Sequence, residues 1–202
     1  MKLADIRPAI TKINSSPKLS DPRAITYLAT YPSILKFSAA SGSITVDRFN
    51  QLAVMAYGWM PRVVRINHDY VAKAIGALNV AVATKAIGDL SATSLQDIEH
   101  CLNSVVGASK ILHFVNNEIF PIWDSNVEGF RMSRSASTYH MRCVANYFSY
   151  ACEVHSIRSE PGFNTFYADF SVAMNSRLAT LGITAYKISE VRAIEAAAFE
   201  LA

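Results

Sequence analysis

A lysine and an aspartate, Lys110 and Asp124, stand on either side of an apolar link. Lys110 lies near the start of a predicted helix over residues 109–116, and Asp124 follows Ile119-Phe120-Pro121-Ile122-Trp123, 124 − 110 = 14 positions after the lysine. A carboxylate stabilises positive charge that builds on a nearby carbon and orients an attacking water. A lysine attacks as a neutral amine or holds an anion as an ammonium. Without its neighbours, Asp124 is more simply an N-cap and Lys110 a surface lysine, although capping and catalysis are compatible.

The segment before Lys110 predicts two helices joined by a tight turn, over about residues 95–116. Gly107 permits the two backbones to approach closely at the turn, which we expect over residues 103–107. The amides of the residues that open the second helix would then face outward and hold a phosphate oxygen without reading base sequence. The outward amides are those of Gly107, Ala108, Ser109 and Lys110, and Val106 just before them is a further candidate for contact with DNA. Glycine-containing helical hairpins are also common where no phosphate is bound.

Aromatic side chains elsewhere are candidates to line a pocket. Tyr57-Gly58-Trp59-Met60-Pro61-Arg62 ends a predicted helix, and its rings suit stacking on a planar ligand, although packing in the core is the commoner role of such rings. His113 and Trp123 flank the predicted carboxylate, and a lone histidine on so apolar a helix is more often a core residue. Further candidates for the same cleft lie near or on the helix that follows: Tyr139, His140, Tyr147 and Tyr150.

Basic residues gather in two places that suit contact with phosphates. Arg62 follows the aromatic motif, and Arg131, Arg134, His140 and Arg142 occur between residues 129 and 142 without an acid. The net charge of +3 is compatible with a polyanionic partner without requiring one. The alternative for the second group is a solvated helix face.

The elements that position these residues are helical, and the fold class predicted is all-α. Apolar residues recur at spacings of three and four along 3–13 and 46–55, and no alternating strand pattern of useful length occurs. Asp21-Pro22 predicts a helix that Tyr31-Pro32 interrupts, with a loop at Ala40-Ser41-Gly42-Ser43. Asn67 is predicted to cap a helix that runs to about Lys85. This helix is apolar on most of its faces, so we expect it to lie at the centre of the fold. Later helices are predicted from Ser94 and over 141–157, 163–181 and 189–201.

Composition limits the classes of protein that the chain can represent. Hydrophobic residues make up 51% of the 202 residues, which is enough for one sizeable helical domain over 1–202. No run of about 18 apolar residues predicts a membrane span, and the first residues have no apolar region typical of a secretory signal. Cys101, Cys143 and Cys152 lack metal-ligand spacing, so we expect free thiols in the cytoplasm, and no zinc, iron–sulfur or other cofactor.

The string from the hairpin to Asp124 resembles that of helix–hairpin–helix DNA glycosylases. Gly107 resembles the last hairpin glycine of that family, Lys110 its lysine, and Pro121-Ile122-Trp123-Asp124 its aspartate turn, expected over about 119–127. The string is most similar to that of short proteins with an oxoguanine-glycosylase fold. Two features depart from the family: valine replaces the first hairpin glycine, and the helix between hairpin and aspartate is about one turn shorter.

The resemblance implies a two-lobed helical bundle with its active site in the cleft between the lobes. It also implies an enzyme that flips a damaged or modified base out of double-stranded DNA and hydrolyses its N-glycosidic bond, leaving an abasic site. Asp124 would be the catalytic carboxylate, and Lys110 would permit strand cleavage if it formed a Schiff base, although the shortened helix favours a monofunctional enzyme. Some bacterial relatives remove glucosylated hydroxymethylcytosine from phage DNA, which makes antiviral defence a candidate role alongside repair.

Two other classes of function fit the same residues. A non-catalytic helical module that kept the hairpin would bind DNA in a salt-dependent, sequence-independent manner and release no base. A helical protein–protein adaptor would show no such affinity. No motif in the sequence predicts an obligate protein partner or a membrane.

Overall fold

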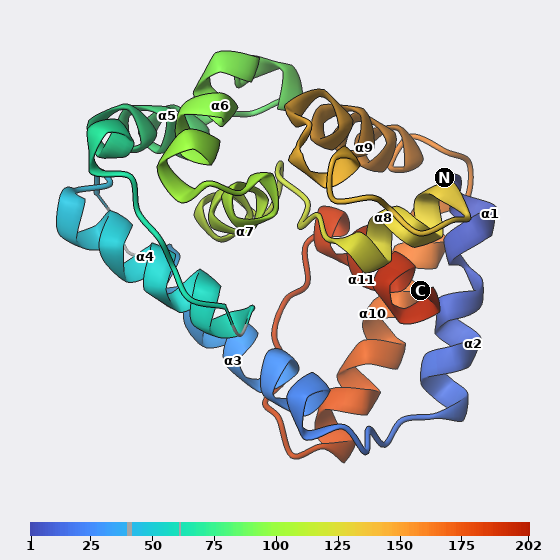
Figure 1. Cartoon of the computed structure of the whole chain (residues 1–202). Coiled ribbons are helices and arrows are strands. Elements are labelled where there is room, and N and C mark those ends of the chain that lie inside the picture. Colours follow the sequence, from blue (N-terminus) through green and yellow to red (C-terminus); the bar gives the residue numbers. More distant parts are fainter. Residues whose placement is uncertain (40–41, 61) are drawn as a thin grey trace.

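The computed structural model describes residues 1–39, 42–60 and 62–202, and none of these residues lies in a β-strand (Figure 1). The predicted all-α class is therefore confirmed. In chain order the elements are α1 Leu3–Ile6, α2 Pro8–Ser15, α3 Pro22–Ser38, α4 Val46–Trp59, η1 His68–Tyr70, α5 Val71–Ala83, η2 Ile87–Asp89, α6 Ala92–Leu102, α7 Val105–Val115, α8 Ser125–Met132, η3 His140–Arg142, α9 Val144–Ile157, α10 Phe163–Thr180 and α11 Glu190–Leu201.

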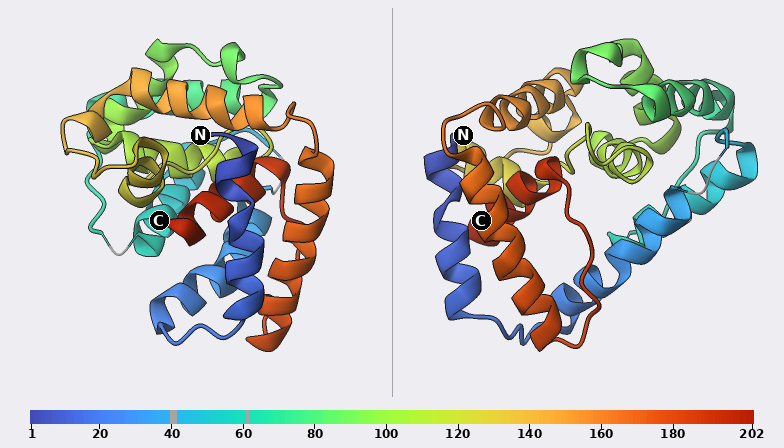
Figure 2. Two further views of the ribbon diagram at one scale, coloured as in Figure 1. Left: turned by 90° about the vertical axis from the view of Figure 1, so that its right-hand side faces the viewer. Right: turned by 180° about the vertical axis from the view of Figure 1, so that it is seen from behind.

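The helices fall into two groups according to their packing. Helices α3 to α7 contact one another, whereas α1 and α2 pack against α10 and α11, and α8 and α9 also pack on α11. The N- and C-terminal helices therefore share one side of the molecule, as the two further views in Figure 2 show. Helices α7 and α9 join the groups, since α7 contacts α9 as well as α3 to α6.

The central helix is α7, which differs from the expectation for residues 67–85. Helix α7 buries nearly every residue from Val105 to Phe114. Helix α5 instead leaves Val80 and Val82 exposed by 48% and 46%. An apolar composition therefore did not make α5 central, because α4, α6 and α7, which contact α5, do not enclose all of its faces.

Three predicted helix boundaries are wrong, each for a local reason. Helix α3 continues through Pro32, since its buried face, which includes Tyr31 and Ile34, extends across the proline. Helix α6 begins at Ala92, because the Ser91 hydroxyl caps it by accepting from the Ser94 amide at 3.0 Å. Helix α7 begins at Val105 rather than after Gly107, because Ser104 caps it.

Other predicted boundaries are confirmed. Asp21 caps α3, and Asn67 caps the short η1 that leads into α5. Helix α10 is followed by Gly182 with φ of 71°, and Ser189 caps α11. The predicted loop at Ala40–Ser43 and the motif from Tyr57 to Arg62 fall partly on Ala40, Ser41 and Pro61, which lie outside the described residues.

The helices of the described part are too short or too polar to cross a bilayer. This agrees with the absence of a membrane span in the sequence prediction.

Candidate active site

The turn that leads to Asp124 is held by its backbone. Each of its five consecutive carbonyl groups accepts a hydrogen bond from a different side chain. His155 Nε2 bonds Ile119 O at 2.7 Å, His113 Nδ1 bonds Phe120 O at 2.7 Å, Tyr147 Oη bonds Pro121 O at 3.3 Å, Tyr150 Oη bonds Ile122 O at 3.1 Å and Ser109 Oγ bonds Trp123 O at 3.3 Å. We call residues 119–123 the clamped turn. Because α7 and α9 supply all five donors, the turn is fixed relative to both groups of helices.

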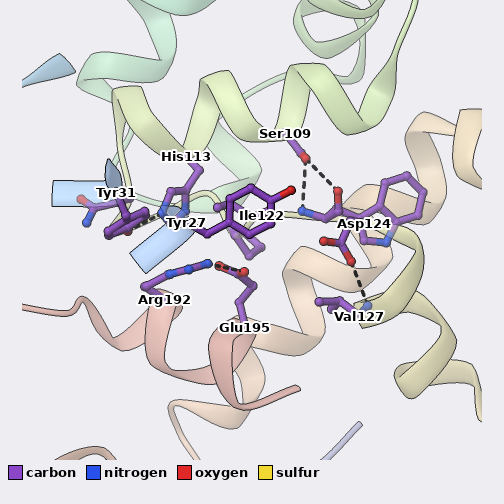
Figure 3. Close-up of polar contacts among 12 residues, drawn as sticks. Tyr27, Tyr31, Ser109, His113, Ile122, Asp124, Val127, Arg192 and Glu195 are labelled. Atoms are coloured by element: carbon purple, nitrogen blue, oxygen red, sulfur yellow. Dashed lines mark hydrogen bonds and ion pairs between the residues drawn. The ribbon is translucent and has the colours of Figure 1, made fainter. Parts of the chain in front are cut away.

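Asp124 ends the clamped turn and caps α8. Its Oδ1 accepts hydrogen bonds from the amides of Asn126 and Val127, both at 3.0 Å, and Figure 3 shows the bond from Val127. Its Oδ2 accepts no hydrogen bond from the described residues, and the residue is only partly buried. The predicted capping role is therefore confirmed, and one carboxylate oxygen stays available to a ligand.

Lys110 lies in the same site as Asp124. Its side chain is nearly enclosed, with 8% of its surface exposed, and its Nζ lies 5.2 Å from the centre of the Trp59 ring. Burial lowers the pKa of Lys110, while the charges of Asp124 and Glu195 act in the opposite direction. Such an ammonium, close to a carboxylate and over an aromatic face, is not an ordinary surface lysine.

The Trp59 ring, over which the Lys110 ammonium lies, packs among aromatic rings of α3 and α7. The Trp59 ring centre lies 5.3 Å from that of Tyr27, 6.3 Å from that of Tyr31 and 5.5 Å from that of Phe114. The Trp59 indole also donates to Tyr27 O at 3.3 Å. Tyr31 and Phe114 are buried, whereas Tyr27 and Trp59 are only partly buried, so Tyr27 and Trp59 are the rings of this cluster that a planar ligand next to Lys110 could reach.

His113 links the aromatic rings to the clamped turn. Its Nδ1 donates to Phe120 O, so its Nε2 is the acceptor for the Tyr31 hydroxyl at 2.6 Å. Burial, followed by the charge of Arg192, lowers the pKa of His113 to about 3. The ring is therefore neutral at neutral pH, and it has the structural role that an apolar helix predicts.

The neutrality of His113 predicts a specific sensitivity to acid. The unfolded chain binds a proton on His113 below about pH 6.5, whereas the folded chain does not until about pH 3, so acid favours the unfolded chain. Wild-type protein is expected to lose about 2 kcal/mol of unfolding free energy from this group between about pH 6.5 and pH 5. Denaturant titrations of wild type and His113→Gln at each pH measure it, since the variant lacks this contribution. Equal pH slopes for the two proteins would contradict the assignment.

Comparison of the chain with protein-family models, curated proteins and solved structures found no match. The assignment of function therefore depends on the geometry of the site.

The structure brings together some of the predicted site residues. Lys110, Asp124, Trp59 and His113 share the site, and Arg62 is exposed but close enough for its charge to lower the pKa of Lys110, after the larger effects of burial and the acids. Of the predicted pocket residues, Trp59 and His113 therefore lie in the same site as Lys110, and the others do not.

The remaining predicted pocket residues lie outside this group. Tyr57 donates its hydroxyl to Leu102 O at 2.9 Å, and Tyr139 is 87% exposed. Trp123 is fully buried against His140 and Tyr147, where its indole donates to Glu128 at 3.0 Å. The polar group of Tyr57 is thus bound to Leu102, that of Trp123 is bound to Glu128, and that of Tyr139 lies in solvent, so none of the three lies beside Lys110.

The amides expected to hold a phosphate are mostly occupied. The Gly107 amide donates to Ser104 Oγ at 2.9 Å and the Ala108 amide to Ser104 O at 2.9 Å, and Ser109 uses its hydroxyl in the clamped turn. The expectation of four outward amides is therefore wrong, because α7 starts two residues before Gly107. The amides of Val105 and Val106 come before the first of these capping bonds in the chain, so they are the only α7 amides in the described residues that these bonds do not occupy at the start of the helix.

The predicted basic group near α8 is only partly free. Arg131 forms ion pairs with Glu128 at 2.7 Å and with Glu153 at 2.5 Å, and His140 bonds Glu128 at 2.5 Å. Arg131 is thus committed within the fold and is not available to a phosphate. Arg134 and Arg142 are exposed.

Two charged residues of α11 belong to the site and were not predicted. Glu195 is 2% exposed and pairs with Arg192, whose guanidinium carbon lies 4.6 Å from the centre of the Tyr31 ring. The sequence carries a signal for Glu195, because it stands four residues after Val191 and three before Ala198 on the inward stripe of the helix. A glutamate at such a position needs a partner or a function.

Two hollows of the surface lie away from this site. One of about 490 Å³ is lined by residues of the 65–70 segment and the end of α6, and one of about 650 Å³ lies beside α2. Neither contains Lys110, Asp124 or Glu195, and no group of three metal-binding side chains occurs in the described residues. The arrangement with paired charges and aromatic rings is the better candidate for chemistry, although access to it requires movement of the side chains that cover Lys110.

Proposed function

We propose that the protein is a DNA glycosylase that hydrolyses the N-glycosidic bond of a damaged or modified base. The proposal depends chiefly on one observation: Asp124, with a free Oδ2, and Lys110 share a site beside the aromatic surface of Trp59. A flipped base stacks on such rings, and an anchored carboxylate stabilises the positive charge that develops at C1′ as the base departs. The division of the helices into two groups joined at α7 is compatible with the two lobes that this proposal requires.

The clamped turn supports this role for Asp124 in particular. A carboxylate that stabilises a transition state needs a fixed position before the reaction begins, because any reorganisation adds to the barrier. Hydrogen bonds to five consecutive carbonyls provide that fixation, and the two amides of α8 orient the side chain. An aspartate that served only as a helix cap would not need so extensive a support.

Lys110 has two roles under this proposal. As an ammonium it holds the departing base or a phosphate, and as an amine it forms a Schiff base with C1′ and leads to strand cleavage. The lowered pKa of Lys110 favours the amine. Borohydride trapping of a protein–DNA adduct distinguishes the two, with Lys110→Gln as the control that must abolish any adduct.

Release of free bases tests the proposal directly. Purified protein is incubated with unmodified duplex DNA, oxidised DNA and phage DNA that contains glucosylated hydroxymethylcytosine, and mass spectrometry identifies the bases in solution. The expected result is one class of released base with an equal number of alkali-sensitive sites. Salt-sensitive binding to all three DNAs without base release would instead support the non-catalytic module. The absence of binding and of release would support a protein adaptor.

A further inference from the structure

Glu195 has a carboxyl oxygen that the fold does not use. Its Oε1 pairs with Arg192, one turn earlier on α11, whereas its Oε2 is buried and has no hydrogen-bond partner among the described residues. Only 2% of the surface of Glu195 is exposed. An unpaired oxygen of this kind costs free energy, so it points to a function or to a proton on the acid.

Glu195 lies close enough to Asp124 for the charges of the two carboxyl groups to interact. Figure 3 shows both carboxyl groups between α7 and α11, with Arg192 beside Glu195. Helix α8, which Asp124 caps, packs directly on α11. The charges of Asp124 and Lys110 both act on Glu195. The two acids therefore approach one region from two different helices.

We propose that Glu195 is a second acid of this site and donates a proton from Oε2 to the departing base, while Asp124 acts on the sugar. This inference rests on the proposed glycosylase function. In the reaction the C1′–N bond breaks and its electron pair goes to the base nitrogen, and the base takes the proton of Glu195. The oxygen of a water molecule bonds to C1′ and the water gives a proton to Asp124. Water is the only co-reactant.

The surroundings of Glu195 favour its protonated form at neutral pH. Burial raises the pKa of Glu195 to about 7, although Arg192 opposes this change, and the charge of Asp124 supports it while Lys110 opposes it. The phenols that face Glu195 come from α3, α9 and the segment before α11: Tyr31, Tyr147, Tyr150 and Tyr186. Burial raises the pKa of each phenol, so all four are neutral and leave Asp124 as the competing anion. Two carboxyl groups in different environments are a common arrangement for acid–base chemistry.

The arrangement also assigns a role to Arg192. Its guanidinium is held between the Tyr31 ring and Glu195. Once Glu195 has given up its proton, Arg192 stabilises the carboxylate that remains. Arg192 is thus a positioning residue for Glu195.

The test compares single-turnover base release over pH 6 to 9 for wild type and Glu195→Gln, with the DNA class from which wild type releases a base. Glutamine has nearly the same shape but carries no transferable proton. We expect the wild-type rate to fall as the pH rises through about 7. Glu195→Gln is expected to be about 10²-fold slower at pH 6 and to lack this fall. Glu200→Gln is the matched control, because Glu200 also pairs with an arginine and lies on the same helix, and its rate should equal that of wild type.

Several results would overturn the proposal. A wild-type rate that is constant from pH 6 to 9 contradicts it whatever the variants do, and so does a Glu195→Gln protein that keeps the wild-type rate and pH profile. If Glu195→Gln does not fold, Glu195→Asp retains a carboxyl group and must keep a falling alkaline limb at a reduced rate. Infrared difference spectra between wild type and a folded variant must show a protonated carboxyl at pH 6 that disappears by pH 9. If wild type releases no base from any DNA, the glycosylase proposal itself fails.

Discussion

Replacement of Asp124 by asparagine is expected to reduce the rate of base release by about 10³-fold without unfolding the protein. Asparagine is as good an N-cap as aspartate, so the bonds from Asn126 and Val127 to Oδ1 are retained. The negative charge that would stabilise C1′ is lost. Single-turnover assays of base release measure the rate, and circular dichroism with thermal unfolding measures the fold.

Asp21 provides a matched control for this substitution. It caps α3 in the same way, since its Oδ1 accepts from the Arg23 amide at 2.9 Å, but it takes no part in the site. Asp21→Asn should keep the wild-type rate and a similar midpoint of unfolding. If Asp124→Asn released bases as fast as Asp21→Asn, Asp124 would be a cap and nothing more, and the proposed chemistry would be wrong.

Substitution of Gly107 by alanine is expected to destabilise the protein by about 3 kcal/mol. A Cβ atom on Gly107 would lie 2.6 Å from Tyr57 Oη and 3.0 Å from two ring carbons. The ring must move, and the buried bond from its hydroxyl to Leu102 O is then lost. Denaturant titration measures the loss, which corresponds to a decrease of about 6–12 °C in the melting temperature of a chain of this size.

A second substitution, at Tyr57, shows how much of the loss comes from the clash between the new Cβ atom and the Tyr57 hydroxyl. Tyr57→Phe in the Gly107→Ala background removes the nearest atom but leaves the ring carbons at 3.0 Å. It should therefore recover part of the lost stability, whereas in wild type it should only destabilise. Gly76→Ala is the control, because nothing lies within 4 Å of its Cβ and alanine should add up to about 1 kcal/mol. Equal effects of alanine at positions 107 and 76 would contradict the packing described for α7.

The predictable part of the fold follows from local patterns. The helical spacing of apolar residues and the caps at Asp21, Asn67 and Ser189 are properties of short segments, and they gave the all-α class and most boundaries. Pro32 and the start of α7 were misplaced because tertiary packing and one serine side chain outweighed the local signal. The Asp124-Ser125-Asn126 string predicted an N-cap at Asp124, and its capping geometry is confirmed.

The composition of the site was less accessible to sequence reasoning. Lys110 and Asp124 were identified, yet the partners Tyr31, Arg192 and Glu195 come from helices at opposite ends of the chain. Their proximity depends on how α3 and α11 pack, which no local pattern specifies. The phosphate amides were misjudged for a smaller reason, since a shift of two residues in the start of α7 changes which amides are free.

The clamped turn has a consequence for how the chain can vary. The position of Asp124 depends on hydrogen bonds to backbone carbonyl groups, which every residue type possesses. The identities of the side chains in the clamped turn therefore contribute little to where Asp124 lies. Side chains in the turn can be exchanged for others of similar volume while Asp124 stays in place, provided that the five donors at 109, 113, 147, 150 and 155 remain. We therefore expect distant proteins with the same geometry around this aspartate to share these donors more often than the Phe120-Pro121-Ile122-Trp123 string that precedes it.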